Sequence, residues 1–116
     1  MLQKEFNCPV EATLSIIGGK YKAIILWHLL DATLRFSELR RLIPSATPKM
    51  LTQQLRDLEH EGIISRKVYP VVPPKTEYTI TSYGESMRGI LVEMCSWGKE
   101  YMSNNDSDES DNKETV

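Results

Sequence analysis

The chain has few of the residues that covalent frameworks and metal sites require. It contains two cysteines and two histidines among its 116 residues. The cysteines are far apart in sequence, so they do not form a disulfide framework. The four residues, Cys8, His28, His60 and Cys95, also lack the spacing of zinc ligands. We therefore expect neither a metal site nor a bound cofactor.

The chain also lacks long apolar runs and catalytic motifs. No run approaches the roughly 20 apolar residues that a membrane span needs, and the N-terminal residues do not have the organisation of a signal peptide. These absences predict a cytoplasmic protein without membrane contact. The sequence contains no glycine-rich phosphate loop and no nucleophile motif, so we do not expect an enzyme.

Positive charge is concentrated in the middle of the chain, although the formal net charge of the whole chain is −2. Residues 35–75 contain eight Lys or Arg residues and four Asp or Glu residues, which gives this segment a net charge of +4. Residues 103–116 contain five acidic residues and one lysine, which gives a net charge of −4. Because local charge is what meets phosphates, the central segment suits a nucleic-acid partner.

Residues 47–62 have the signals of an amphipathic helix. Thr47 can cap the first free amide groups, and Pro48 suits the first helical position because its missing N–H costs nothing there. Gly62 can adopt the left-handed conformation that ends many helices. Residues at i, i+4 and i+7 form one apolar stripe, which consists of Leu51, Leu55 and Leu58.

The opposite side of this helix is polar. At about 100° per residue, it carries Lys49, Gln53, Arg56 and His60, with Thr52 at its edge. Glutamine can pair with adenine, arginine with guanine, and lysine and threonine with phosphates. The pattern indicates either a helix that enters a groove of DNA or an ordinary amphipathic surface helix.

The segments around this helix predict a mainly α fold with a small β-hairpin. The expected elements are a short helix from Pro9 to Gly18, a core helix at Lys20–Leu30, a minimal strand at Leu34–Phe36, a helix at Ser37–Ile43, strands at Ile63–Tyr69 and Lys75–Ile80, and a long helix that starts at Thr81 or Ser82. In and beside the helix 37–43, we expect Phe36, Leu39, Leu42 and Ile43 to face inward. Two short helices joined by three or four residues form a helix-turn-helix, and the hairpin is its wing.

The last helix carries an apolar stripe that a small domain cannot cover by itself. We expect a second copy of the chain to cover it. The stripe consists of Met87, Ile90, Leu91, Met94, Trp97 and Tyr101. The sequence thus predicts an N-terminal arm at 1–7, a folded domain with a dimerisation helix at 8–102, and an acidic disordered tail at 103–116.

Several motifs together resemble those of a known family. They are CPVEATLSIIGGKYK, ILWHLL, LRFSELRRLIP, KMLTQQLRDLEHEGII, RKVYPVVPPKTEYTIT and CSWG. From Cys8 to about Gly98 the chain strongly resembles the HxlR-type family of bacterial transcriptional regulators, which is related in fold to MarR-type proteins. The resemblance implies a winged helix-turn-helix homodimer. In that family the first and last helices form the dimer, which adds Leu14 to the expected interface, and two recognition helices enter successive major grooves.

The resemblance places the polar helix 47–62 in the role of the recognition helix. We expect Gln53 and Arg56 to read bases, and Thr47, Lys49 and Thr52 to contact DNA beside them. Family members more often begin this helix with a serine and an acid than with threonine and proline. This departure lies next to the expected base-reading face, so it bears on operator preference.

Five further residues are candidates for DNA contact. Arg35 and Ser37 lie near the start of the preceding helix, where free amides favour a phosphate. Arg40 is either a DNA contact or a structural ion-pair partner. Lys67 and Lys75 flank the wing, where they contact the DNA backbone or minor groove unless the hairpin is merely solvated.

Cys8 directly precedes the helix-starting Pro9, so its sulfur lies near free amide groups and the positive end of a helix dipole. This location favours the thiolate and makes a thiol reactive. The resemblance adds that several HxlR-type regulators sense oxidants or electrophiles through a cysteine in this N-terminal position. The alternative is a small residue that only packs, which is also what we expect of Cys95.

We therefore predict a sequence-specific transcriptional regulator that binds double-stranded DNA as a homodimer at a palindromic operator. The alternative function is a winged-helix protein-interaction module that does not bind DNA, and the basic segment 35–75 argues against it. Whether a small-molecule effector binds is left open by the sequence.

Overall fold

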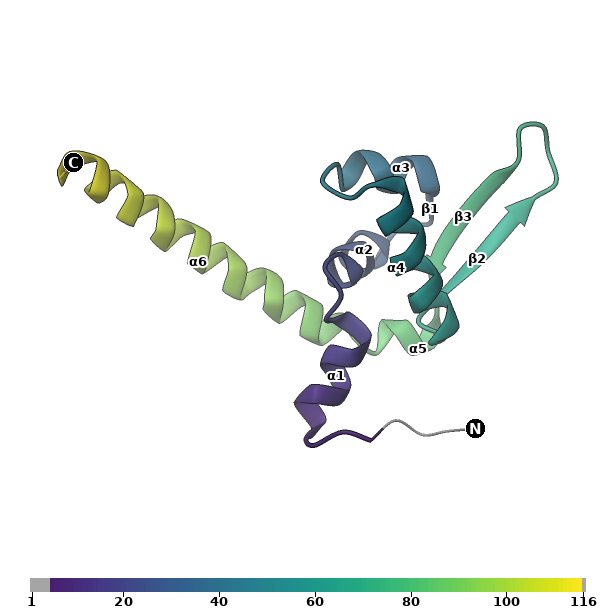
Figure 1. Cartoon of the computed structure of the whole chain (residues 1–116), viewed down its shortest axis with the longest axis horizontal. Coiled ribbons are helices and arrows are strands. Elements are labelled where there is room, and N and C mark those ends of the chain that lie inside the picture. The colour runs from purple at the N-terminus through teal and green to yellow at the C-terminus, as the bar shows by residue number, and fades with distance from the viewer. Residues whose placement is uncertain (1–4, 116) are drawn as a thin grey trace. The chain divides into compact units, whose positions relative to one another are not determined.

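The computed structural model of the chain describes residues 5–115, and it describes side chains as far as residue 105. The chain divides into two compact units, Met1–Ser86 and Met87–Val116. Figure 1 shows the helices and strands of both units. The first unit contains the helix-turn-helix and the hairpin, and the second unit is one long helix.

The first unit is mainly helical and has one small sheet. Its described elements are α1 (Pro9–Ile17), α2 (Lys22–Leu29), β1 (Leu34–Arg35), α3 (Phe36–Leu42), α4 (Pro48–His60), β2 (Ile64–Tyr69), β3 (Lys75–Ile80) and α5 (Ser82–Glu85). The two short helices α3 and α4, followed by a hairpin, form a winged helix-turn-helix. This fold class confirms the prediction from the sequence.

Helix α2 supplies the centre of the core. The side chains of Ile25, Leu26 and Leu29 are at most 1% exposed, as expected for a helix that is apolar on most sides. Ile24 and Trp27 are exposed, so the helix is not buried all round. The core of the unit is completed by side chains from the other helices and strands and from residues that flank them, among them Ile17, Tyr21, Leu30, Leu39, Ile43, Leu51, Leu55, Leu58, Ile63, Ile64 and Tyr78.

One side chain of α3 does not lie where the sequence predicts. Leu42 is 48% exposed, although its spacing from Leu39 suggests a place in the core. Helix α3 ends at Leu42, and Ile43 leaves the helical conformation with φ −124° and ψ 68°. Because the chain turns at this point, Ile43 takes the inward position and is buried.

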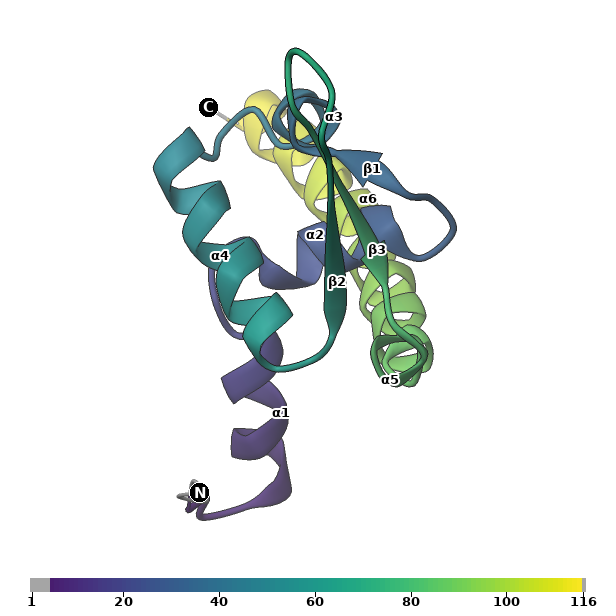
Figure 2. The ribbon, with the colours of Figure 1, turned by 90° about the vertical axis from the view of Figure 1, so that its right-hand side faces the viewer.

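The sheet is antiparallel, with strand order β1-β3-β2 (Figure 2). Leu34 pairs with Tyr78, and the hairpin pairs run from Ile64 and Ile80 at its base to Tyr69 and Lys75 near its tip. The predicted minimal strand and both hairpin strands are thus confirmed. Val68 lies on the same face as Ile64 but is 53% exposed, because the outer half of the hairpin extends beyond the helices (Figure 1).

Helix α4 begins and ends at the predicted residues. The Thr47 hydroxyl oxygen accepts a hydrogen bond of 3.1 Å from the Met50 backbone N–H, and Pro48 occupies the first turn. Gly62 follows the helix with a φ of +77°. These two signals define the length of α4 and therefore the number of side chains that it presents.

The end of the chain differs from the single long helix that the sequence predicts. Thr81 caps the short helix α5, since its hydroxyl accepts a 3.0 Å hydrogen bond from the Gly84 N–H. The Ser86 hydroxyl donates to the Tyr83 carbonyl at 2.6 Å, a local bond that competes with continued helix. A separate helix, α6 (Arg88–Thr115), then begins.

Helix α6 continues through the acidic segment 103–115, which we expected to be disordered. No glycine or proline follows Gly98 to interrupt the backbone. Val116 lies outside the described residues. At the other end, residues 1–4 of the predicted arm also lie outside them, and residues 5–8 form neither helix nor strand.

Replacing Gly62 with alanine should lower the free energy of unfolding by about 1–2 kcal/mol, because an L-residue pays this cost in the left-handed conformation. A Cβ at this position would meet no atom within 4 Å, so backbone strain is the only expected cause. Gly62→Asn is the control, since asparagine adopts this conformation more readily. Urea unfolding followed by circular dichroism measures both variants, and an alanine variant as stable as the parent would contradict the assignment.

Candidate nucleic-acid interface

Helix α4 separates an apolar side from a polar side. Leu51, Leu55 and Leu58 are at most 1% exposed, whereas Lys49, Gln53 and Arg56 are exposed and Thr52 is half-buried. The leucines therefore fix the helix against the core and leave one polar face in solvent. The arrangement follows the period read from the sequence.

The hydroxyl groups of Thr47, at the N-cap of α4, and of Thr52 each form one hydrogen bond within the helix. The Thr47 hydroxyl accepts from the Met50 N–H, so its own O–H can still donate to a phosphate. The Thr52 hydroxyl donates to the Pro48 carbonyl at 2.7 Å, which leaves only its acceptor capacity. Thr47 is thus better suited than Thr52 to a phosphate oxygen, which only accepts.

A groove of about 720 Å³ lies between the start of α3, helix α4 and the tip of the hairpin. Four predicted DNA contacts line it, namely Arg35, Ser37, Thr52 and Lys75. Its other walls include the prolines and valines of the hairpin tip. The fold therefore brings together candidates that are up to 40 positions apart in sequence, between residues 35 and 75.

The hairpin holds its two lysines around one aromatic ring. The ammonium groups of Lys67 and Lys75 lie 4.8 Å and 5.2 Å from the centroid of the Tyr69 ring. A cation over an aromatic face is attracted by the ring quadrupole. Tyr69 is a residue that the sequence analysis missed, although it lies two positions from Lys67 on the same strand face.

The start of helix α3 has an exposed Arg35 side chain for a phosphate, but one of its backbone amides is already hydrogen-bonded. The Arg35 backbone N–H donates to the Glu38 carboxylate at 2.9 Å, so an acid already occupies this end of a seven-residue helix. The exposed Arg35 side chain remains available. Arg40 is also exposed. It lines a hollow with Arg41 and Ser37.

Among the ion pairs of the described residues, Arg66 has a partner, whereas Arg40 and Arg56 have none. The Arg66 Nε atom lies 3.3 Å from the Glu59 carboxylate. Tyr78, which pairs with Arg66 across the hairpin, is buried, and burial raises the pKa of its phenol. The positive charges of Arg66 and Arg56 oppose that rise in the Tyr78 pKa, whereas the negative charge of Glu59 adds to it.

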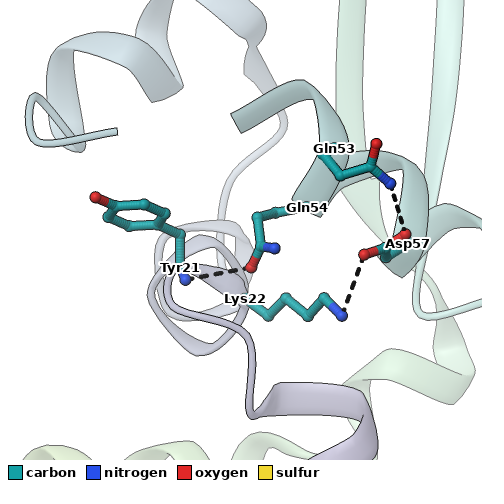
Figure 3. A network of polar contacts seen from close by, with 5 residues as sticks. All are labelled: Tyr21, Lys22, Gln53, Gln54 and Asp57. Atoms are coloured by element: carbon teal, nitrogen blue, oxygen red, sulfur yellow. Dashed lines mark hydrogen bonds and ion pairs between the residues drawn. The ribbon is translucent and has the colours of Figure 1, made fainter. Parts of the chain in front are cut away.

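Gln53 is joined to the start of α2 by a polar network (Figure 3). Its amide nitrogen donates to Asp57 Oδ1 at 3.1 Å, and Asp57 Oδ2 lies 3.3 Å from Lys22 Nζ. The neighbouring Gln54 accepts from the Tyr21 backbone N–H at 3.3 Å. This network was not predicted from the sequence, where its only signal is the i, i+4 spacing of Gln53 and Asp57.

Cys8 is exposed at the N-cap of α1, and its side chain makes no capping hydrogen bond. Cys95 is half-buried in α6. Both cysteines are free. Cys8 is therefore open to solvent reagents at the helix start where the sequence predicts it, which meets the access requirement of a reactive thiol.

The predicted dimer residues divide into an exposed set and a buried set. Leu14, Ile90, Met94, Trp97 and Tyr101 are exposed, and Trp97 and Tyr101 stack with ring centroids 5.4 Å apart. Met87 and Leu91 are buried within the chain.

Within the described residues no helix is long and apolar enough to cross a membrane. In the same part of the chain, no three His, Cys, Asp or Glu side chains are grouped so that they could hold a metal ion.

A recognition helix with an exposed polar face, a groove beside it and a basic wing define the class of winged helix-turn-helix transcriptional regulators, whose members bind DNA. The HxlR-like helix-turn-helix family matches residues 16–106. The chain belongs to this family. The resemblance stated from the sequence motifs is thus confirmed.

Relatives of known sequence and structure agree with this family. The HTH-type transcriptional regulator YtcD of Bacillus subtilis (strain 168) is 53% identical over 103 residues, which cover 89% of this chain and 82% of YtcD. The redox regulator HypR in its reduced form is 47% identical, with a TM-score of 0.80 over 86% of this chain and 99% of HypR. Its oxidised form is 50% identical, with a TM-score of 0.77 over 80% of this chain and 96% of that chain.

Replacing Lys67 and Lys75 together with alanine should weaken DNA binding to a similar degree on every sequence, because phosphate contacts carry no base information. The slope of log K against log salt concentration should become shallower by about 1.8, or about 0.9 per lost contact. Fluorescence anisotropy of a labelled duplex at several salt concentrations measures both quantities. Lys99→Ala removes an exposed lysine of α6 as the control. A double variant with the parent slope would refute the wing contacts.

Proposed function

We propose that the protein is a homodimeric regulator that inserts helix α4 of each copy into the major groove of a palindromic operator. The observation that carries this proposal is the exposed polar face of α4, directly opposite its buried leucines. A helix with this division can lie in a groove about 12 Å wide without unfolding any core contact. Two copies would address half-sites about one helical turn apart.

The exposed residues separate into two kinds of contact. Gln53 and Arg56 have the side-chain chemistry that reads adenine and guanine edges. Lys49 and the Thr47 hydroxyl lie on the same helix and suit phosphates. Around the helix, further phosphate contacts would come from α3 and the wing, through Arg35, Ser37, Arg40, Lys67 and Lys75. Phosphate contacts would fix the position of α4, and the two base readers would select the sequence.

A second copy would cover the exposed apolar side chains of α6. Ile90, Met94, Trp97 and Tyr101 recur at helical spacing, and Trp97 is 67% exposed. Contiguous exposed apolar surface of this kind marks interaction sites, and a two-fold dimer uses the same patch on both copies. Leu14 would join this interface from α1.

A redox or electrophile response would act through Cys8. The residue is exposed, free and placed at a helix start. The similar protein HypR is called a redox regulator and has been solved in oxidised and reduced forms. Since Cys8 is the more exposed of the two cysteines, it is our candidate for the sensing residue.

An anisotropy titration on the promoter region of the protein's own gene tests the proposal. Regulator function predicts binding that is selective over random DNA and that weakens steeply with salt. The rival function, a protein-interaction module, predicts no selectivity at any salt concentration. That result would end the proposal.

Arg56→Ala should reduce the preference for the operator over single-base variants by about 1–3 kcal/mol at one position in each half-site, the value of one good base pair contact. Binding to random DNA should change much less. Titrations on operators that differ at one base pair give the comparison, and Arg41→Ala, an exposed arginine outside the polar face of α4, is the control. Equal losses on operator and random DNA would show that Arg56 contacts phosphate only.

Cys8→Ser should abolish the effect of diamide on operator binding and preserve binding in the absence of the oxidant. The reason is that serine keeps the size of the side chain but removes the thiolate that reacts. Cys95→Ser is the matched control and should keep the response. A diamide response that survives in Cys8→Ser would remove Cys8 as the sensor.

A further inference from the structure

Only one orientation of the Gln53 side-chain amide is compatible with its neighbour Asp57. Its nitrogen lies 3.1 Å from Asp57 Oδ1. An ionised carboxylate only accepts hydrogen bonds, so a rotated amide would bring two acceptor oxygens together. Asp57 therefore holds the nitrogen, and the oxygen of the exposed Gln53 side chain points away from the carboxylate (Figure 3).

Asp57 is itself held by a lysine from another helix. Its second oxygen lies 3.3 Å from Lys22 Nζ, and the Lys22 side chain is only 14% exposed. A mostly buried ammonium needs a polar partner, and Asp57, whose side chain is 41% exposed, supplies it. The Gln53–Asp57 contact thus has support from α2, outside helix α4 (Figure 3).

The junction before α2 is shaped for this close approach. Gln54 Oε1 accepts from the Tyr21 N–H at 3.3 Å, and the Tyr21 hydroxyl donates to the Ser45 carbonyl at 2.9 Å. A Cβ at Gly19 would collide with Gln54 Oε1 and would lie 3.0 Å from the Lys22 side chain. Through these hydrogen bonds Tyr21, at the start of α2, contacts both the loop before α4 and the middle of α4.

We propose that Asp57 and Lys22 are positioning residues that set the base preference of Gln53. With one N–H of its amide on Asp57, Gln53 offers the base an outward oxygen and its remaining N–H. An outward acceptor matches the exocyclic amine of adenine or cytosine in the major groove and opposes the exocyclic oxygen of guanine or thymine. The inference rests on the proposed function, since it assigns how one base is chosen at that same interface.

Operators with all four base pairs at each position test this assignment. Gln53→Ala first identifies the position that Gln53 reads, as the one where the base preference disappears. Asp57→Asn keeps the shape but allows the amide of Gln53 to turn, so the preference for amine-bearing bases at that position should fall about five- to tenfold, within the range of a single base contact. Preferences at all other positions should stay within about twofold.

Lys22→Met is the second variant, because it keeps the aliphatic stem and leaves Asp57 unpaired. It should relax the same position in the same direction, and Lys22→Arg should restore the preference by renewing the ion pair. Thermal unfolding of each variant shows whether the fold is kept. A purely structural role would lower affinity on every operator without moving the preference at one position.

Three results would overturn the proposal. If Asp57→Asn and Lys22→Met weaken binding to all operators equally, the network only stabilises the fold. A preference that shifts at a position other than the one read by Gln53 would show that Asp57 acts elsewhere. If Gln53→Ala changes no preference while the parent protein still selects its operator, Gln53 reads no base, although the proposed regulator function stands. A parent protein without any selectivity would overturn that function too.

Discussion

The burial of Leu51, Leu55 and Leu58 against the core is the contact on which the surface of this protein depends. These three side chains are at most 1% exposed, and each fully buried leucine stabilises the fold by about 1.5–3 kcal/mol. Because an α-helix has a fixed period, burying this stripe determines which residues of α4 remain outside. The polar face is therefore a consequence of core packing, and a mutation in the core would rotate or release the residues proposed to meet DNA.

Helix α4 is fixed by more than its apolar stripe. Thr47 and Gly62 define its ends, and the start of α2 contacts it through Gln54 and Asp57. A site that must read bases needs side chains held within a narrow range of positions. The polar contacts add a constraint on side-chain orientation, which hydrophobic burial does not supply because it is non-directional.

Most of the fold could be predicted from the sequence because its signals are local. The caps of α4, the leucine period and the prolines between β2 and β3 each act within a few residues. Contacts between distant segments could not be predicted in this way. The Asp57–Lys22 pair, the two lysines around Tyr69 and the groove from Arg35 to Lys75 arise only once the chain has folded. The exposure of Leu42, which we expected to face inward, and the break after α5 depend on where helices end, which is the least certain part of a pattern.

The central claim is that α4 occupies the major groove, and methylation interference on the operator tests it most directly. Methylation of guanine N7 blocks the major-groove edge and leaves the minor groove and the phosphates open. The account predicts two clusters of guanines whose methylation prevents binding, with centres about 10 base pairs apart. Full binding to an operator methylated at every guanine N7, or interference confined to adenine N3 in the minor groove, would contradict it.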